Sequence, residues 1–194
     1  ESTLSFYGEN NIYYRNYFDD KTENEIKEFC KSLLINDFIN ANIINYAISD
    51  IDSMKKGLKI TFKFTVGNFV RQQDDLYFLN IDPFKIIDNV DWLIKEQRNF
   101  PLYFAFPHLV KKQINIDLAE GFTFKSLPKS QHLSSENISY SKIFNTKSPT
   151  NLVIDEIYEI KTEEILAKSY KKTKQIFENI INLNNDKMIL TKTN

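Results

Sequence analysis

Cysteine and histidine are almost absent from this sequence, and their scarcity excludes several kinds of site. Cys30 is the only cysteine, so no disulfide forms within the chain and no cysteine-rich zinc site can be built. The two histidines, His108 and His132, lie far apart and show no H-x-x-x-H spacing. We therefore expect no bound metal and no cofactor.

Arginine is also rare, and basic charge shows no excess. Only three of the 25 basic residues are arginine, and the net charge is −1. Binding to nucleic acid or to an anionic membrane needs a concentrated basic face, so neither partner is expected. No apolar run reaches the roughly 18 residues that a membrane span needs. The sequence begins at Glu1 without a methionine or signal peptide, and we expect a mature product or an excised piece of a longer protein.

Glycine is scarce, and none of the glycines belongs to a phosphate-binding loop. All four are isolated and are interpreted as turns or bulges: Gly8, Gly57, Gly67 and Gly121. Aromatic residues, by contrast, are abundant, with 16 Phe and 10 Tyr. Aromatic side chains suit a pleated, half-buried surface, so this balance favours strands.

Two amphipathic helices are predicted. Residues 22–35 begin with Thr22–Glu25, which fits the S/T-x-x-E capping box, and apolar residues follow at helical spacing. Residues 166–183 show a second apolar stripe of the same period. Cys30 lies inside the first stripe.

Short alternating segments predict the strands, of which residues 58–66 are the clearest. Leu58, Ile60, Phe62, Phe64 and Val66 alternate with Lys and Thr, as one buried and one wet face of an antiparallel sheet require. In 151–161 the apolar set changes face at Ile157, which indicates a bulge. The other predicted strands are 4–8, 12–18, 42–49 (with Ile44, Tyr46 and Ile48 on one face), 75–81, 102–106, 112–118, 122–124, 138–144 and 188–191. Residues 85–95 are interpreted as a short helical turn or an irregular crossover, and 129–137 as a polar loop.

These elements predict a mainly β chain, an antiparallel two-sheet β-sandwich with two packed amphipathic helices. A seam near 82–97 divides the chain into an N-terminal portion, 1–84, and a C-terminal portion, 85–194, that carries the last helix. One continuous domain is the alternative.

The only thiol–imidazole pairing that the composition allows is Cys30 with His108 or His132. A catalytic cysteine is usually partly exposed and stabilised as a thiolate, whereas Cys30 lies mid-helix on an apolar stripe, where free cysteine behaves as a small hydrophobe. We interpret Cys30 as a core residue and expect no catalytic residue in this chain.

Acidic residues offer two further candidates, and neither fits its chemistry well. Residues 50–53 resemble the opening of a calcium loop, but Lys55 stands where the loop needs glycine and Thr61 where it needs glutamate. Glycoside hydrolysis needs two carboxylates at a defined separation, and no partner acid is evident for the acidic pairs. These pairs are Asp19–Asp20, Asp74–Asp75, Asp155–Glu156 and Glu163–Glu164.

Exposed aromatic side chains could stack on sugar rings. The candidates are Trp92, Tyr13, Tyr14, Tyr77 and Tyr103. Aromatic residues more often fill a core, so burial in the sandwich is the alternative, and the ligand-binding residues stay unknown.

The stretch Arg98–Pro128 carries a family pattern. Arg98-x-x-Pro101 is followed by a strand and then by INIDLAEGFTFKSLP, which contains a short strand, a Gly121 turn and a closing Leu127-Pro128. This pattern resembles the C-terminal domain of unknown function (the DUF3858 type) that follows the transglutaminase-like core in exported Bacteroidetes proteins with an N-terminal DUF3857 domain. Ala119 replaces the first proline of that pattern.

The resemblance implies a non-catalytic β-sandwich appendage, because the family's Cys-His-Asp triad belongs to the preceding core. It also implies export to the periplasm or cell surface. We therefore expect an accessory module that positions a neighbouring transglutaminase-like or peptidase-like domain or binds its protein substrate. A stand-alone module that binds carbohydrate or peptide is the alternative.

Overall fold

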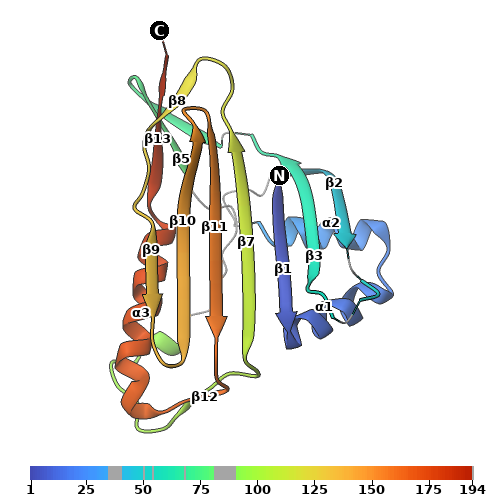
Figure 1. Ribbon diagram of the computed structural model, residues 1–194, viewed down its shortest axis with the longest axis vertical. Coiled ribbons are helices and arrows are strands. Elements are labelled where there is room, and N and C mark those ends of the chain that lie inside the picture. The colour runs from blue at the N-terminus through green and yellow to red at the C-terminus, as the bar shows by residue number, and fades with distance from the viewer. Residues whose placement is uncertain (35–40, 50, 54, 68, 81–90, 194) are drawn as a thin grey trace.

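The computed structural model describes residues 1–34, 41–49, 51–53, 55–67, 69–80 and 91–193 (Figure 1). The fold is mainly β, with antiparallel sheets of seven and four strands and three α-helices in the described residues. The strands are β1 (Ser2–Gly8), β2 (Asn42–Ser49), β3 (Leu58–Thr65), β4 (Val70–Gln73), β5 (Leu76–Asn80), β6 (Leu102–Tyr103), β7 (His108–Asp117), β8 (Phe122–Ser126), β9 (Gln131–Ser134), β10 (Ile138–Ser148), β11 (Asn151–Ile160), β12 (Glu164–Ile165) and β13 (Lys187–Lys192). The helices are α1 (Glu9–Asp19), α2 (Glu23–Ser32) and α3 (Tyr170–Asn184), with short 3-10 turns η2 (Asp91–Leu93) and η3 (Ala167–Ser169).

The seven-stranded sheet has the order β2-β3-β1-β7-β11-β10-β9, and strands from both 1–84 and 85–194 pair within it. The four-stranded sheet has the order β4-β5-β13-β8 and also joins both parts, while β6 and β12 form a small ribbon. The expected mainly β, antiparallel two-sheet class is thus confirmed.

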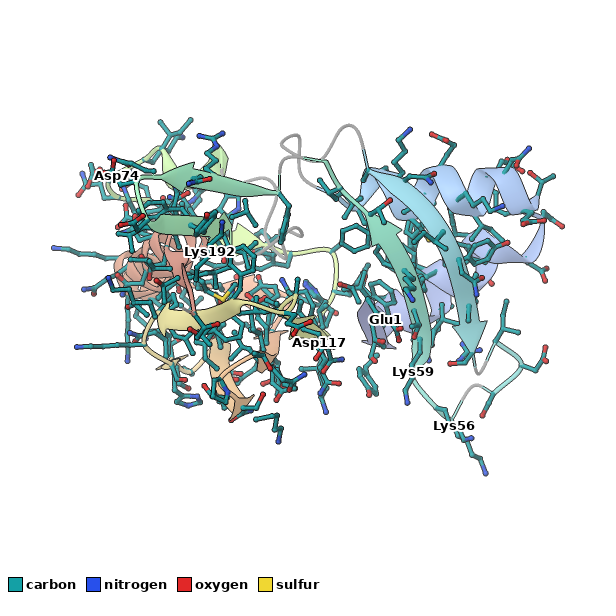
Figure 2. The ribbon with its side chains drawn as sticks, turned by 90° about the horizontal axis from the view of Figure 1, so that it is seen from above. Glu1, Lys56, Lys59, Asp74, Asp117 and Lys192 are labelled. Carbon is teal, nitrogen blue, oxygen red and sulfur yellow. The ribbon has the colours of Figure 1, made fainter. Side chains whose placement is uncertain are left out.

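Three groups of elements pack side by side on one face of the seven-stranded sheet. Helices α1 and α2 pack on β1 and β3, the four-stranded sheet packs on β7 and β11, and α3 packs on β10 and β11. The second layer of the sandwich is therefore partly helical. The opposite face is open and carries polar side chains, among them the labelled Lys59 and Asp117 (Figure 2). On that face Gln113 Nε2 and Asn145 Nδ2 donate to Asp155, at 2.7 and 3.0 Å.

The capping box at Thr22 is confirmed. The Glu25 amide donates to Thr22 Oγ1 at 3.4 Å, and the Thr22 amide donates to Glu25 Oε2 at 2.9 Å. Helix α2 ends at Ser32, three residues before the predicted end.

The predicted strand at 12–18 is wrong, because these residues belong to α1. Gly8, with φ of 62°, turns the chain out of β1 and directly into this helix. The buried side of α1 is formed by Asn11, Arg15 and Phe18, at helical spacing. Two of these three residues are polar, so the apolar pattern gave no helical signal.

The inner face of β2 differs from the expected one by a β-bulge between Ile43 and Asn45. Ile43 packs against the core instead of Ile44, which is 52% exposed, while Tyr46 and Ile48 stay on the inner side. The strict alternation predicted for β3 is confirmed, with Leu58, Ile60 and Phe62 buried.

In the C-terminal part, two predictions are wrong. The polar loop expected at 129–137 contains β9, which pairs with β10 at the sheet edge. The face change expected at Ile157 does not occur, because the alternation continues through a buried Glu156. Of the predicted turn at 85–95, residues 85–90 lie outside the described residues, and η2 follows. The segments predicted at 102–106 and 112–118 correspond to the shorter β6 and the longer β7, and the last helix and strand to α3 and β13.

Candidate functional site

An apolar cavity of about 440 Å³ lies between the four-stranded sheet and the end of β7. Its floor is made of cross-strand partners on one sheet face. Val70 pairs with Leu79, Gln72 pairs with Tyr77, and Tyr77 pairs with Leu190 of β13. Because these partners lie side by side on the pleat, the short β4–β5 hairpin presents a continuous apolar surface. The lining residues that the structure describes are Phe69, Val70, Gln72, Tyr77, Leu79, Ile116, Asp117, Leu118, Ala119, Phe122 and Leu190.

The opposite wall is the turn that carries the family pattern. Gly121 has φ of 83°, a conformation that L side chains rarely adopt, and the Phe122 amide donates to the Ala119 carbonyl at 3.2 Å. The Thr193 amide binds the Gly121 carbonyl at 2.9 Å and ties the turn to the end of β13. The turn thus places Phe122 edge-on to Tyr77, with ring centroids 5.0 Å apart. The Lys192 ammonium lies over both rings, 5.7 Å from the centroid of Tyr77 and 6.0 Å from that of Phe122.

Few charged groups lie at this cavity. Among its described lining residues Asp117 is the only carboxylate or ammonium group, and it accepts a hydrogen bond from Asn151 Nδ2. Gln72 adds a neutral amide. Such a lining suits an apolar group that brings a few main-chain hydrogen-bonding groups with it.

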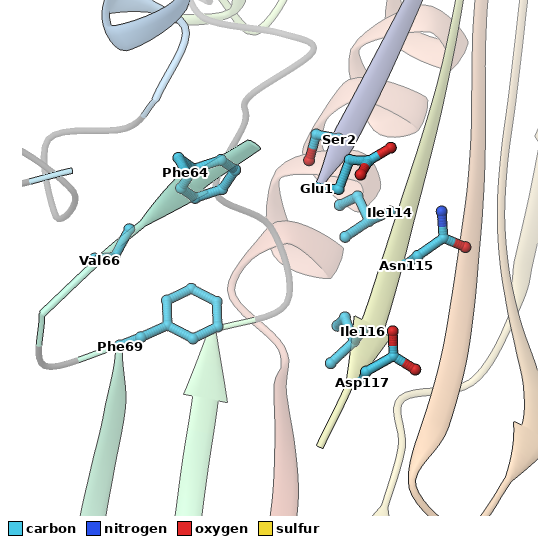
Figure 3. A pocket seen from close by; sticks show the side chains of 9 residues that line it. All are labelled: Glu1, Ser2, Phe64, Val66, Phe69, Ile114, Asn115, Ile116 and Asp117. Atoms are coloured by element: carbon cyan, nitrogen blue, oxygen red, sulfur yellow. The ribbon is translucent and has the colours of Figure 1, made fainter. Parts of the chain in front are cut away.

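A second cavity of about 320 Å³ adjoins the first and shares Phe69, Ile116 and Asp117 with it. Figure 3 shows that it opens between the end of β3, with Phe64 and Val66, and the end of β7. Its remaining lining is Glu1, Ser2, Ile114 and Asn115.

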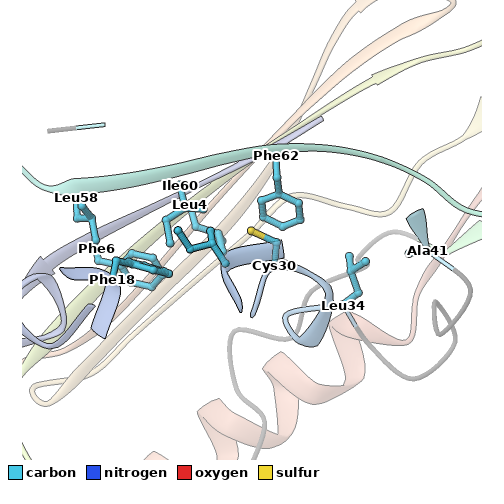
Figure 4. Close-up of a cluster of buried hydrophobic side chains, with 10 residues drawn as sticks. Leu4, Phe6, Phe18, Cys30, Leu34, Ala41, Leu58, Ile60 and Phe62 are labelled. Carbon is cyan, nitrogen blue, oxygen red and sulfur yellow. The ribbon is translucent and has the colours of Figure 1, made fainter. Parts of the chain in front are cut away.

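The structure does not bring Cys30 near an imidazole that could activate it. Cys30 is fully buried among the apolar residues below β1 and β3 (Figure 4), and burial raises the pKa of its thiol to about 11. His132 lies on β9, at the opposite edge of the seven-stranded sheet. His108 begins β7, where its ring contacts Phe106 and Tyr158.

The acidic candidates are also dispersed. Asp155 lies on the open face of β11, whereas the neighbouring Glu156 lies on the buried face. Glu164 accepts a hydrogen bond from Tyr103 Oη at 2.9 Å, and this bond raises the pKa of the Tyr103 phenol. Asp19–Asp20 end α1, and Asp74–Asp75 form the β4–β5 turn. In the described part of the chain, no three His, Cys, Asp or Glu side chains are grouped so as to hold a metal ion.

The loop that resembles a calcium site is occupied by an arginine, a feature that the sequence did not reveal. Asp50 lies outside the described residues. The Arg15 guanidinium donates to the carbonyls of Ile51, Ser53 and Lys56, the last two at 2.8 and 2.9 Å. A covalently attached cation thus lies where carbonyl oxygens converge.

The aromatic candidates are not grouped into one binding face. Trp92 packs edge-on against Phe177, with ring centroids 4.6 Å apart, and Tyr14 packs between α1 and β1. Tyr13 and Tyr103 are exposed, on α1 and β6 respectively. Only Tyr77 lines a described cavity.

A buried charge cluster was also missed from the sequence. Glu156 of β11 lies between Lys112 of β7 and Lys142 of β10, as a direct cross-strand partner of each, and all three are almost fully buried. Glu156 contacts both ammonium groups, and its Oε1 accepts a hydrogen bond from Tyr140 Oη at 2.6 Å. The sequence signal for this cluster is an alternation that continues through Glu156, which a pattern of apolar residues alone does not show.

None of the described helices has the length and apolar character needed to cross a membrane.

Comparison with known proteins gives two matches of different kinds. The chain is similar in structure to a crystal structure described as a "putative protease" from Parabacteroides distasonis, with a TM-score of 0.49 and 10% identity. That match covers 61% of this chain and 24% of the other chain, so this chain corresponds to about a quarter of that protein. No curated protein matches the sequence. The model of the family described as "Domain of Unknown Function with solved-structure structure (DUF3858)" matches residues 74–190, more than half of the sequence and most of the cavity lining. The chain therefore belongs to the DUF3858 family.

Proposed function

We propose that this chain is a non-catalytic accessory module of a larger exported protein, and that it binds polypeptide on behalf of a transglutaminase-like or peptidase-like core. The single observation that carries the proposal is the apolar cavity between the four-stranded sheet and the turn around Gly121. Its aromatic and aliphatic lining, with neutral Gln72 and the rim carboxylate of Asp117, suits the side chains of a protein segment.

Two further observations support a binding role over turnover. The thiol of Cys30 is buried and has a raised pKa, so it lacks the thiolate character that acyl transfer requires. The described lining residues of the cavity include no nucleophile–base pair. In this proposal the core carries the chemistry, and the module holds the core or its protein substrate.

The cavity also favours polypeptide over sugar. Sugar rings stack on uncovered aromatic faces, whereas Tyr77 and Phe122 are nearly perpendicular, at 88°, and the Lys192 ammonium lies over both rings. Calorimetry with soluble glycans is therefore expected to show no binding that depends on Tyr77.

The test uses β4, whose alternate side chains face opposite ways. Val70→Glu places a carboxylate in the cavity, and Gln73→Glu places the same charge on the other side of the strand, outside the cavity lining. Binding to a separately produced transglutaminase-like core from the same polypeptide is measured by calorimetry. We expect Val70→Glu to weaken binding about tenfold, from the cost of an unpaired charge in an apolar site, and Gln73→Glu to leave it unchanged.

Equal effects of the two variants would contradict the cavity as the binding site. Hydrolase or acyl-transfer activity in this chain alone, lost in Cys30→Ala, would contradict the accessory role. The absence of any such core from the encoding gene would remove the proposed partner.

A further inference from the structure

Apolar side chains project into solvent at the end of the molecule that carries β6 and β12. Among the described residues, the three most exposed large apolar side chains are Ile94 at 78%, Phe100 at 77% and Tyr103 at 68%, and Leu166 is 45% exposed. We call these four residues the apolar tip. Exposed apolar side chains that occur as a group mark a surface that binds a partner.

Strand pairing places Tyr103 and Leu166 on one side of the ribbon of β6 and β12. Tyr103 is the direct partner of Glu164, and Leu166 lies two residues beyond Glu164, so these side chains share a face. Leu102 and Ile165 are buried on the other face and attach the ribbon to the core under α3. The core thus fixes the direction in which the apolar tip points.

The segment before β6 reaches the same end through contacts with Tyr170, the first residue of α3. The Tyr170 Oη lies 2.7 Å from the Lys95 carbonyl oxygen, and the Arg98 guanidinium lies over the Tyr170 ring, 5.5 Å from its centroid. Ile94 adjoins Lys95, and Phe100 follows Arg98 by two residues, so both lie near the start of α3. Figure 1 shows β12 and the start of α3 together at the lower end of the view.

Basic residues are concentrated around the apolar tip, although the whole chain has a net charge of −1. Residues 92–103 and 161–174 contain seven lysine or arginine residues and three glutamates, whereas acidic residues exceed basic ones in the remainder. The exposed cations of these two segments are Lys95, Lys161, Lys168, Lys171 and Lys172. The net charge of the sequence predicted no basic face, because the acidic remainder conceals this local excess.

Two of the three glutamates already have partners at this end. Glu96 Oε1 accepts a hydrogen bond from Lys174 Nζ at 2.7 Å, and Glu164 Oε1 accepts one from Tyr103 Oη at 2.9 Å. The surface around the apolar tip is therefore cationic, with exposed hydrocarbon at its centre.

A bilayer with anionic headgroups complements both features at once. Its hydrocarbon lies directly behind a charged layer, so short apolar side chains can enter it while lysine ammonium groups stay among the headgroups. A tyrosine suits the boundary, because its ring is apolar and its hydroxyl is polar. We propose that the apolar tip docks this chain on an anionic lipid surface, with the surrounding lysines bound to the headgroups. The apolar cavity lies at the other end of β7, so this inference does not depend on the proposed function.

The test measures sedimentation of the full chain with lipid vesicles. One set contains equal parts of phosphatidylglycerol and phosphatidylcholine, and the other contains phosphatidylcholine alone. We expect binding to the first set only, and a loss of at least about tenfold in affinity when salt rises from about 0.05 M to about 0.5 M, since salt screens the lysines.

Two pairs of variants assign the binding to the apolar tip. Phe100→Ser should weaken it about tenfold, whereas Ile44→Ser, which removes a 52% exposed side chain from β2, should leave it unchanged. Lys168→Glu with Lys172→Glu should weaken it at least about tenfold. Lys59→Glu with Lys63→Glu makes the same charge change on β3 and should weaken it less than about threefold. All of these side chains except Ile44 and Phe100 are charged and exposed, and an unchanged Tm checks that each variant folds.

Insertion is checked with Phe100→Trp and phosphatidylglycerol vesicles whose acyl chains carry bromine, which quenches only indoles that reach the hydrocarbon. We expect quenching in Phe100→Trp and none in Ile44→Trp. Absence of binding to the anionic vesicles, equal binding to both sets, or equal effects within either pair of variants would overturn the proposal. If Phe100→Ser weakened binding of a protein core while the vesicles bound nothing, the apolar tip would be a protein interface and the proposal would be wrong.

Discussion

Two buried cationic sites, one in each half of the large sheet, differ in the partners that the structure describes. Under β3, the Arg15 guanidinium is surrounded by loop carbonyls and by Asn11 Oδ1, at 2.9 Å from Nε. Between β7 and β10, Lys112 and Lys142 face the carboxylate of Glu156. Among the contacts that the structure describes, carbonyl and amide oxygens face the first site, and a carboxylate faces the second.

The difference follows from where each site lies. Arg15 is on α1, beside the loop that precedes β3. The carbonyls of this loop are outside any strand ladder, so they can accept hydrogen bonds from the guanidinium, a planar group with five donors. Glu156 is in the middle of a sheet, where backbone groups are already used by the ladder and only side chains can pair with a charge. Along β11 it separates Ile154, which packs under the four-stranded sheet, from Tyr158, which packs under α3. The Glu156 cluster thus lies where the four-stranded sheet gives way to α3 on this face.

Removing the carboxylate should have the largest effect. Glu156→Gln keeps the shape and an acceptor for Tyr140 but removes the negative charge that faces two buried ammonium groups. Breaking a buried pair in this way costs about 3–5 kcal/mol, measurable as a lower urea midpoint with an unchanged slope. Glu159→Gln, on the open face of the same strand, is the matched control and should cost less than about 1 kcal/mol. A similar loss for both variants would show that the buried cluster is not special.

Arg15→Lys should cost about 2 kcal/mol, because an ammonium group keeps the charge but cannot reach several carbonyls at once. Arg71→Lys, on the exposed strand β4, makes the same chemical change where no such cluster exists and should be neutral. Equal stability of Arg15→Lys and the unmodified chain would show that the several carbonyl contacts of the guanidinium do not stabilise the fold.

Labelling of Cys30 sharpens the comparison by reporting on one half alone. Its thiol is buried under β3 and has a pKa of about 11, so iodoacetamide at pH 8 reacts only through opening of that region. We expect Arg15→Lys to speed labelling roughly tenfold and Glu156→Gln to speed it less than about threefold in the absence of denaturant. Equal acceleration would mean that the two halves open together.

The smallest predicted effect concerns the exposed ion pair of Lys21 and Glu25, which contrasts with the two buried sites. Hydrogen bonds from Lys21 and then from Thr22 lower the pKa of Glu25 to about 2, from 4.5. A depressed carboxyl pKa stabilises the fold above pH 4.5, and this stabilisation is lost as the pH falls towards 2. Thr22→Ala should cost about 1 kcal/mol at pH 7 through the lost N-cap acceptor, and less at pH 2, where about half of the Glu25 carboxyls are protonated and no longer complete the capping box. A cost independent of pH in chemical unfolding would contradict this coupling.

Local signals predicted local structure well. The alternation of β3 and the Thr22–Glu25 box depend on neighbours in sequence, and both are present. Helix α1 was missed because Asn11 and Arg15 fill its inner side. Their described carbonyl partners, in Ile51, Ser53 and Lys56, are about forty residues away. Strand β9 was missed because its burial alternates only weakly at an edge.

The apolar cavity likewise combines a part that local sequence indicates with a part that depends on long-range contacts. Its wall of Leu118, Ala119 and Phe122 belongs to the pattern that identified the family. Its floor comes from Val70, Tyr77 and Leu190, which meet only because β13 inserts between β5 and β8. No periodicity along the chain encodes that meeting, so the site could be predicted as a family marker but not as a cavity.

The buried charge cluster of Lys112, Glu156 and Lys142 also bears on the register of the strands. Hydrophobic alternation has a period of two, so a strand displaced by two residues would still bury the same kind of side chains. In β7, β10 and β11 the buried positions are otherwise mostly apolar, and such a displaced pairing would satisfy them almost as well. A two-residue slip of β7 would instead place Ile114 or Val110 opposite Glu156 and separate Lys112 from its carboxylate. The cluster therefore favours the native register over the two registers displaced by two residues, because only the native register pairs Lys112 with Glu156.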